Sequence, residues 1–476
     1  MCNFKKTTMK NIKRLIAALP LLLSAGMLAA QEAVPEDNYY SMERIRSKSG
    51  WMTSSNAAGL EANSADLSIV EGFWNYEKGG LRDVWDGTKN NFFGVYTESY
   101  RKLNKLSLYG KLGFDYLYEN DKAWSSMTYP GSTPMLISDN IPGQHRRERY
   151  SVAAGISIPV GDRVSLGVNG EYNTVSAIKR RDIRSQSLDS RLNISPGIMV
   201  KTKPVNLGLS LSYSYEGETV ELGREGSMAN MSFVYEFKGL WFSKPQSYSV
   251  NTHKARRFDT NVYGGAVQAE FNISPSVKFF NEGGIKYLSQ EQSLKGDGVE
   301  NKFGSYDKLG YTYNGLISFK GSRMDHYIKL NADFFDLNLY SDIFTLQPVP
   351  GISGSTEMTY FGKVRSYYES CMQLGAEYQF YKKRNEWNSS LIVKAGVNYL
   401  DWDKTCTAYP AKWMQNIKST YMYVSATPNF LTKNGMIDVT VEVGYRTGSG
   451  TSNEKSVGEG VDVEFSTLVQ NTELLE

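Results

Sequence analysis

The chain has 476 residues, and its 53 basic and 50 acidic side chains leave a formal net charge of +3. This balance excludes bulk electrostatic attraction to nucleic acid as the basis of function. Beyond residue 30 no apolar run reaches spanning length, which excludes a helical membrane domain, whereas a mean hydropathy of −0.42 and 13% aromatic residues suit a transmembrane β-barrel.

The first thirty residues have the layout of a secretory signal peptide. A basic stretch from Lys10 to Arg14 precedes an apolar run from Leu15 to Leu28, and the small residues Ala29 and Ala30 follow. We expect cleavage before Gln31. A membrane anchor is the alternative, but the run is shorter than the roughly 20 residues that a spanning helix needs. Residues 31–64 are then an irregular periplasmic segment, either a short tail or a partial plug.

From about residue 65 to 470 the chain alternates apolar and polar residues with period 2, the pattern of half-buried β-strands. The apolar members of the clearest segments are Leu108, Leu112, Phe114 and Tyr116; Val152, Ala154, Ile156 and Ile158; Leu207, Leu209, Leu211 and Tyr213; Val267, Ala269, Phe271 and Ile273; Met372, Leu374, Ala376 and Tyr378; Ile437, Val439, Val441 and Val443. A soluble sandwich would show the same period, so period alone does not identify a membrane protein.

The lengths of the connections favour a barrel. Short turns are predicted near 102–105, 161–163, 201–205, 274–276, 320–326, 381–387 and 431–435. They alternate with long polar segments near 120–149, 174–190, 216–261, 289–308, 338–366, 401–418 and 447–459. Short turns on one side and long loops on the other are typical of the periplasmic and extracellular rims of an outer-membrane barrel.

The number of strands follows from parity. An outward strand near 65–76 and a closing strand containing Val461, Val463, Phe465, Thr467 and Val469 complete the series. The prediction is an all-β, antiparallel, up-and-down transmembrane β-barrel of about 16 strands, or 14 if these two segments do not both join the wall. Both termini are then periplasmic, and residues 471–476 form a tail.

Ionisable residues recur on the polar face of the predicted strands. So many are tolerated only in a wet or internally paired lumen. The candidate lumen-lining residues are Lys111, Asp115, Glu171, Glu270, Lys278, Glu282, Lys329, Asp333, Glu377, Lys394, Asp438 and Glu442. Whether the lumen is open depends on residues 31–64 and on the longest loop, 216–261, whose apolar residues 233–237 and 240–242 predict either a cap or a small extracellular hairpin.

A basic loop and a pair of cysteines are predicted at the extracellular rim of the barrel. A basic loop with Lys179, Arg180, Arg181 and Arg184 could hold the phosphates of lipopolysaccharide or attract an anionic solute; its alternative role is to keep the rim solvated. After removal of Cys2 with the signal, Cys371 and Cys406 remain, and either a disulfide that pins a loop to the wall or two separate buried thiols fits their positions.

Nothing in the sequence predicts catalysis or a cofactor. The three histidines, His145, His253 and His326, lie in no catalytic or metal-ligand spacing, and a structural role is favoured for each. The acidic pairs of the outer loops are interpreted as solvated side chains. Nucleotide, metal and nucleic-acid sites are not predicted.

With the signal, the alternation and the stretch from Asn56 to Leu60 in view, the chain resembles uncharacterised outer-membrane β-barrel families of the Bacteroidota. That resemblance implies location and fold only. The same stretch is similar to the Asn-Pro-Ala-Gly motif of fatty-acid-transporter barrels, with Ala57 in place of proline, and implies a hatch in the lumen. Such barrels commonly end on an aromatic residue read by the barrel-insertion machinery, whereas this chain ends Leu474-Leu475-Glu476.

The function that these observations favour is passage of a small solute across the outer membrane, through a porin-like channel or facilitated transporter. One alternative is a non-conducting surface protein whose loops serve adhesion or partner docking. The other is a transporter of hydrophobic solutes. Expected partners are membrane lipids, lipopolysaccharide and the insertion machinery.

Overall fold

The structure is a computed structural model that describes most of the chain between residues 46 and 455. The expected signal peptide, the closing strand at 461–469 and the tail at 471–476 lie outside the described residues. The described residues are 46–63, 66–79, 82, 85–181, 183–223, 234–239, 245–246, 255–296, 299–348, 351, 356–385, 388–408, 411–432 and 435–455.

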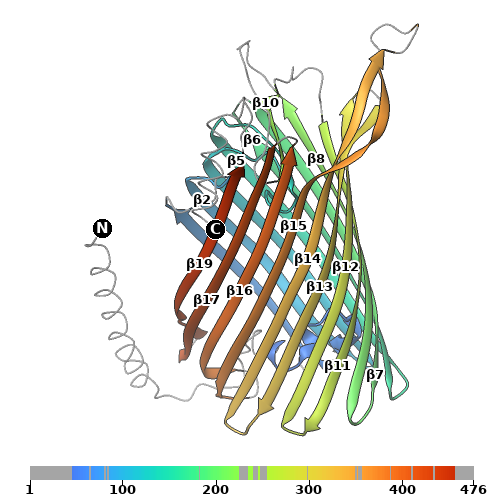
Figure 1. Cartoon of the computed structure of the whole chain (residues 1–476). Helices are drawn as coiled ribbons and strands as arrows, with labels where there is room; N and C mark the ends of the chain where they lie inside the picture. The colour runs from blue at the N-terminus through green and yellow to red at the C-terminus, as the bar shows by residue number, and fades with distance from the viewer. Residues whose placement is uncertain are drawn as a thin grey trace.

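One antiparallel sheet of sixteen strands forms a tilted wall around a lumen (Figure 1). Neighbours in the wall follow chain order, which confirms the predicted up-and-down topology. The wall strands are β1 (Leu67–Lys78), β2 (Lys89–Leu103), β3 (Leu106–Lys122), β5 (Gly143–Val160), β6 (Val164–Lys179), β7 (Arg184–Lys201), β8 (Val205–Gly223), β11 (Ala255–Ser274), β12 (Val277–Gly296), β13 (Val299–Lys320), β14 (Met324–Pro348), β15 (Thr356–Lys383), β16 (Ser389–Ala408), β17 (Ala411–Thr432), β18 (Gly435–Asp438) and β19 (Val441–Lys455).

The last two strands share one position in the wall. Residues 429–432 of β17 pair with β18, whereas residues 412–426 pair with β19. In the described part of the chain, β1 pairs with β2 and β19 with β17, so these two strands border the sheet.

The seven short turns lie where the alternation predicts them, and together they define the short-turn rim. They connect β2 to β3, β5 to β6, β7 to β8, β11 to β12, β13 to β14, β15 to β16 and β17 to β18. The opposite end is the long-loop rim.

The long segments are shorter than predicted, because the strands continue into them. Most of 289–308 belongs to β12 and β13, and most of 401–418 to β16 and β17. β15 reaches 28 residues, whereas about ten cross a bilayer. Beyond that height the outward face meets water, so pairing persists without apolar alternation.

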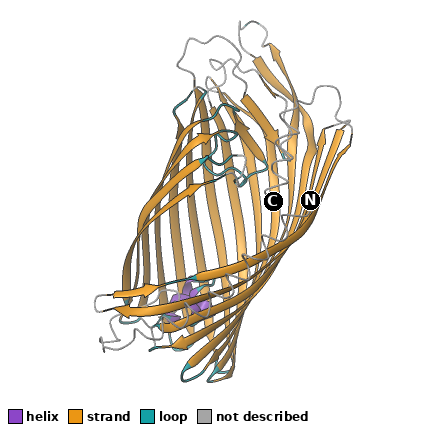
Figure 2. Cartoon of the chain, turned by 90° about the vertical axis from the view of Figure 1, so that its left-hand side faces the viewer, coloured by secondary structure: helices purple, strands orange, loops and turns teal. Residues whose placement is uncertain are grey.

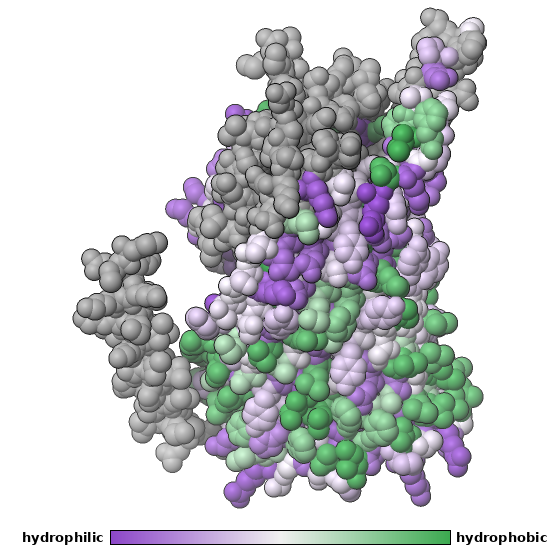
Figure 3. All heavy atoms as spheres, viewed as in Figure 1, coloured by the Kyte–Doolittle hydropathy of each residue, from purple (hydrophilic) through white to green (hydrophobic). Residues whose placement is uncertain are grey.

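The outward face carries a band of apolar side chains. Leu207, Leu209 and Leu211 of β8 are each about half exposed, as their period predicts. Towards the long-loop rim the band ends at an aromatic row in which the rings of Tyr213 and Tyr263 lie 5.3 Å apart. Figure 3 shows apolar residues gathered over the half of the wall near the short-turn rim. Exposed apolar strands flanked by aromatics match a lipid-facing surface.

Two short 3-10 helices lie inside the wall near the short-turn rim (Figure 2). They are η2 (Gly50–Met52) and η3 (Ala57–Ala62), and we call residues 46–63 the lumenal segment. No helix in the described residues is long and apolar enough to cross a membrane.

A second sheet of three strands lies near the long-loop rim, ordered β10-β9-β4. Its strands are β4 (Met135–Ser138), β9 (Val234–Lys238) and β10 (Pro245–Gln246). We call this sheet, together with residues 123–142, the cap. The cap reaches from Arg147 of β5, whose guanidinium lies over the Tyr129 ring, to Tyr367 of β15, whose ring touches Gly239.

Candidate functional site

Asn56 fixes the lumenal segment to the wall. Its side-chain oxygen accepts a hydrogen bond from the backbone N–H of Ala58 at 3.0 Å and so caps η3. Its side-chain nitrogen donates to the carbonyl of Ile198 at 2.9 Å and to Oε1 of Gln268 at 3.0 Å. Asn56 is 2% exposed, so breaking these bonds would leave buried polar groups without hydrogen-bond partners. Each such group would cost about 1–3 kcal/mol of stability.

Ser55 adds a second attachment. Its backbone N–H and its hydroxyl both lie within 3.0 Å of Oε2 of Glu282, and its hydroxyl also lies 2.9 Å from that of Ser210. Gln268 donates to the same Glu282 oxygen at 2.9 Å. Glu282, a predicted lumen residue, therefore holds the segment instead of lining open water.

Glycines of the wall admit the segment at close range. A Cβ on Gly167 of β6 would overlap the backbone of Ala58, and one on Gly197 of β7 would overlap the side chain of Asn56. Trp51 packs on the opposite side, where its ring meets that of Phe280 edge-on at 5.2 Å. The wall is shaped for this segment, because any side chain at these glycines would occupy its place.

Ion pairs hold both ends of the lumenal segment. Glu61 pairs with Lys201 and accepts a hydrogen bond from Ser165. At the other end Arg46 pairs with the buried Glu98. The stretch from Asn56 to Leu60, singled out for its resemblance to a hatch motif, thus lies in the middle of a segment attached at several points.

The cap is attached by a buried carboxylate. Oε1 of Glu218 on β8 accepts hydrogen bonds from the backbone N–H of Thr128 at 2.7 Å, the hydroxyl of Thr128 at 2.9 Å and the hydroxyl of Ser187 at 2.6 Å. Burial raises the pKa of Glu218. An apolar cluster that includes Val234, Tyr235 and Phe258 packs the cap against the wall. Part of the predicted 216–261 loop thus belongs to the cap, which is one of the two alternatives that the sequence leaves open.

The predicted anion-binding loop is not assembled as one site. Lys179 is buried, pairs with Asp139 and donates to the carbonyl of Ile141 at 2.7 Å. Arg181 donates to the carbonyl of Pro142 at 3.1 Å, while Arg180 and Arg184 are exposed. The burial of Lys179 corrects the expectation, since its charge stabilises the base of the cap rather than facing the outside.

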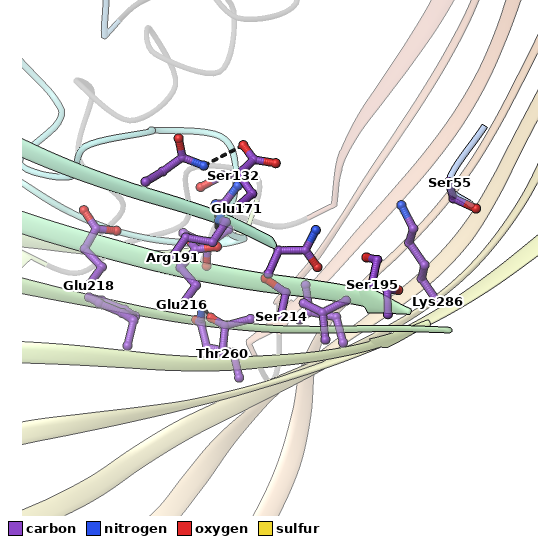
Figure 4. A pocket seen from close by; sticks show the side chains of 18 of the residues that line it. Ser55, Ser132, Glu171, Arg191, Ser195, Ser214, Glu216, Glu218, Thr260 and Lys286 are labelled. Atoms are coloured by element: carbon purple, nitrogen blue, oxygen red, sulfur yellow. Dashed lines mark hydrogen bonds and ion pairs between the residues drawn. The ribbon is translucent and has the colours of Figure 1, made fainter. Parts of the chain in front are cut away.

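A chamber of about 530 Å³ lies between the lumenal segment and the cap (Figure 4). The segment contributes Ser54 and Ser55, and the cap contributes Ser132 and Thr133. The wall contributes Asn169, Glu171, Asn173, Arg191, Asn193, Ser195, Ser212, Ser214, Glu216, Glu218, Phe258, Thr260, Val262, Lys286, Leu288, Gln290 and Tyr306.

Charge is distributed unevenly within the chamber. Arg191 pairs with Glu216, and the side chain of Asn173 donates to Glu171 at 2.8 Å. Behind them, above the aromatic row, Asp189 has a pKa raised to about 7 by burial and by the charges of Glu216 and Glu218. At the cap end the chamber is lined by three carboxyl groups, of Glu171, Glu216 and Glu218, and by one guanidinium, that of Arg191.

The strand register puts all twelve predicted lumen residues on the face that the lumenal segment contacts, and several pair with one another. Asp115 meets Arg149 at 2.5 Å, Glu270 lies 3.5 Å from Lys278, and Lys329 lies 3.7 Å from Glu377. Of the twelve, the chamber is lined by Glu171 alone. The remaining residues lie elsewhere on the same face of the wall: Lys111, Asp333, Lys394, Asp438 and Glu442.

The chamber residues that the sequence analysis missed lie mainly at the long-loop ends of strands. Arg191 directly follows the predicted loop 174–190. Glu216 and Glu218 lie at the start of the predicted loop 216–261. The alternation Ser210-Leu211-Ser212-Tyr213-Ser214 continues in phase to Glu216, and extending this phase would have found both glutamates.

Cys371 and Cys406 are buried and not joined by a disulfide. In the register of β15 and β16, Cys371 is opposite Trp402 and Cys406 is opposite Tyr367. The two thiols are thus four positions apart along the sheet, about 13 Å at the usual rise per residue. A disulfide requires Cα atoms within about 7 Å, so the geometry excludes the bridge and agrees with the alternative of two separate buried thiols.

The two histidines among the described residues lie far apart and form no joint catalytic or metal-binding site. His326 lies near the short-turn rim, with Nδ1 2.7 Å from the hydroxyl of Tyr378. His145 is buried near the cap, where burial and then Lys122 and Lys179 lower its pKa to about 3. His253 lies outside the described residues. No group of three potential metal ligands occurs in the part of the chain that the structure covers.

Sequence comparison identifies a family. The profile of a family of unknown function, DUF6850, matches residues 57–472. The chain belongs to the DUF6850 family. The match includes the lumenal segment from Ala57 onwards, the wall and the cap. No curated protein shows significant similarity to the chain.

Several solved structures match the chain at low identity. The outer membrane transporter YddB from Escherichia coli is 8% identical with a TM-score of 0.38, covering 76% of this chain and 55% of its own. The RagAB peptide importer in its closed-closed state is 8% identical with a TM-score of 0.40, covering 92% and 58%. The translocator domain of autotransporter NalP from Neisseria meningitidis is 11% identical with a TM-score of 0.29, covering 74% and 89%. The chain spans little more than half the length of the first two.

Proposed function

We propose that this DUF6850 protein is an outer-membrane barrel that passes a small polar solute through its lumen, and that the chamber is a binding site along this pathway. The observation that carries the proposal is the chamber itself. Its lining is mostly hydroxyl, amide and charged groups, and it lies against the inner face of the wall from β6 to β13, between two parts of the chain that occupy the lumen. A purely structural interior of this size would be packed.

The lumenal segment and the cap then act as restrictions on either side of the chamber. Both are held against the wall by polar contacts, such as Asn56 to Gln268 and Thr128 to Glu218, and the cap is also held by its apolar cluster. Such contacts can be exchanged for water, which makes each restriction displaceable. The role of residues 31–64 as a partial plug is part of this proposal.

The same proposal includes the topology. Export by a signal peptide at residues 1–30 and periplasmic termini would place the short-turn rim in the periplasm and the cap outside. The apolar band would contact lipid, and the polar strand ends above the aromatic row would meet the sugars of lipopolysaccharide. The polar chamber disfavours the fatty-acid alternative, although the hatch-like stretch from Asn56 to Leu60 does lie in the lumen.

A specific observation favours docking of a protein partner as a second function. The β14–β15 hairpin projects beyond the other strands (Figure 1), and Ile343, Tyr360, Phe361 and Val364 on it are 49–63% exposed. Exposed apolar residues far from the lipid band are typical of interaction surfaces.

Conductance of the chain from Gln31, reconstituted in a planar bilayer, tests the proposed passage. We expect small or intermittent currents from the intact protein and several-fold larger ones when residues 46–63 are deleted. Folding of both proteins is checked by the heat-dependent gel mobility that barrels show. Silence from both folded proteins would refute passage through the lumen and leave the docking function.

A further inference from the structure

We infer that the chamber binds a zwitterionic solute, an amino acid or short peptide, with its ammonium group towards the cap and its carboxylate towards the lumenal segment. The inference deepens the proposed function and rests on it, since passage through the lumen is what brings a solute to the chamber. Two groups of opposite charge at opposite ends of one cavity support the assignment.

The cap end is the acidic end. Glu171, Glu216 and Glu218 face the chamber there, against the single guanidinium of Arg191. Arg191 pairs with Glu216, and Glu218 receives neutral donors, so the charge of Glu171 is matched only by the amide of Asn173. An ammonium group placed here would meet a carboxylate that has no cationic partner among the described residues.

Lys286 supplies the opposite charge at the other end. It lies on β12 opposite Gly264 of β11, which in turn lies opposite Ser212 of β8, two residues closer to the short-turn rim than Ser214. In the view of Figure 4, Lys286 lies on the same side of the chamber as Ser195 and Ser55 and away from Glu218. Its side chain is exposed to the lumen, and in the described part of the chain its ammonium has no hydrogen bond or ion pair.

The walls between the two charged ends suit a peptide. Hydroxyls and amides such as Asn193, Ser214 and Thr260 offer donors and acceptors to peptide groups. Val262 and Leu288 form an apolar strip on one side, where an aliphatic side chain would be desolvated. A volume of about 530 Å³ is within the range of small-ligand sites and accommodates a tripeptide.

Isothermal titration of the detergent-solubilised chain with the tripeptide Ala-Leu-Ala tests the assignment. Probes with one charge removed are its N-acetylated and C-amidated forms, and the neutral trisaccharide raffinose is the uncharged comparison. The variants are Glu171→Gln and Lys286→Gln. Lys329→Gln is the matched control, because Lys329 is a lumen lysine that does not line the chamber.

We expect each chamber variant to weaken Ala-Leu-Ala about tenfold and Lys329→Gln to leave it unchanged. Glu171→Gln should have no effect on the N-acetylated form, and Lys286→Gln none on the amidated form, because the matching charge is already absent. Raffinose binding at least as tightly as the peptide, or peptide affinity indifferent to both variants, would overturn the inference.

Conductance and binding measurements together distinguish failure of the inferred ligand class from failure of the proposed passage. Conductance without peptide binding would leave passage intact and refute the zwitterion. Charge-dependent peptide binding by a folded but non-conducting protein would refute passage and support the assigned ligand class.

Discussion

At the scale of single residues, two glycines of β6 differ in what they allow. Gly167 faces the lumen, and a Cβ there would overlap the backbone of Ala58, which has no freedom to rotate away. Gly170, three residues further along, faces outward and has no atom within 4 Å of a Cβ position. The same substitution at these two positions therefore separates displacement of the lumenal segment from any general effect on the strand.

We expect Gly167→Ala to push the lumenal segment out of its place. The added methyl cannot be accommodated without moving Ala58, so the hydrogen bonds of Asn56 and Ser55 should be lost together. The measurement is maleimide labelling of an Ala57→Cys variant in which Cys371 and Cys406 are replaced by alanine, because Ala57 is only 7% exposed while the segment is in place. Labelling should accelerate several-fold in Gly167→Ala.

The control is Gly170→Ala, which should label at the parental rate. Equal labelling of all three proteins would contradict the fit between the wall and the segment. A fast rate in both glycine variants would point to a general effect on β6 rather than a displaced segment, because a methyl group at Gly170 meets no other atom.

The sequence could predict which residues face inward but not which of them meet. Alternation along β8 identifies the outward leucines Leu207, Leu209 and Leu211, and parity then assigns the polar face. The partners of Asn56 and Glu282 depend on how an irregular segment lies across the six wall strands from β5 to β12. No local periodicity records such long-range contacts, so the anchors and the chamber emerged only from the structure.

At the scale of elements, the same physics explains the overlong predicted loops. Apolar residues alternate regularly with polar ones only where the outward face of the strand contacts lipid. Above the aromatic row of Tyr213 and Tyr263 the outward face is no longer regularly apolar. Sequence such as 289–296 is then indistinguishable from a loop, although its backbone is paired to β11 and β13.

Also at the scale of elements, both hydrogen bonds from Thr128 of the cap to β8 end on one carboxylate, that of Glu218. We expect Glu218→Ala to release residues 123–142, since the N–H and hydroxyl of Thr128 and the hydroxyl of Ser187 would each lose a buried acceptor. The cost to the local stability of the cap is about 2–4 kcal/mol. Hydrogen exchange of the folded protein, read by mass spectrometry over 123–142, should speed up accordingly.

The matched control for this prediction is Glu221→Ala, a carboxylate of the same strand that is exposed. Exchange over 123–142 should stay at its parental rate there. Unchanged exchange in Glu218→Ala would mean that the apolar cluster around Val234 and Phe258 secures the cap without the carboxylate.

At the scale of the whole molecule, strand direction sets a requirement at the border of the sheet. β1 and β19 both run from the short-turn rim towards the long-loop rim, because each is paired antiparallel to a strand running the other way. Side by side they would be parallel. An antiparallel closed wall needs one strand between them that runs back, and unpaired edges in lipid cost several kcal/mol per group.

We propose that the segment with Val461, Val463, Phe465, Thr467 and Val469 is this closing strand, since its alternation follows directly after β19. In the background without native cysteines, Val70→Cys on the outward face of β1 is combined in turn with cysteine at 463, 465, 467 or 469. At least one pair should form a disulfide in the folded barrel, because opposite residues of paired strands are within bonding reach. A cysteine at Glu464, which would face the lumen, should not. Absence of every crosslink, together with a barrel that stays folded after deletion of residues 456–476, would mean that the wall closes without this segment.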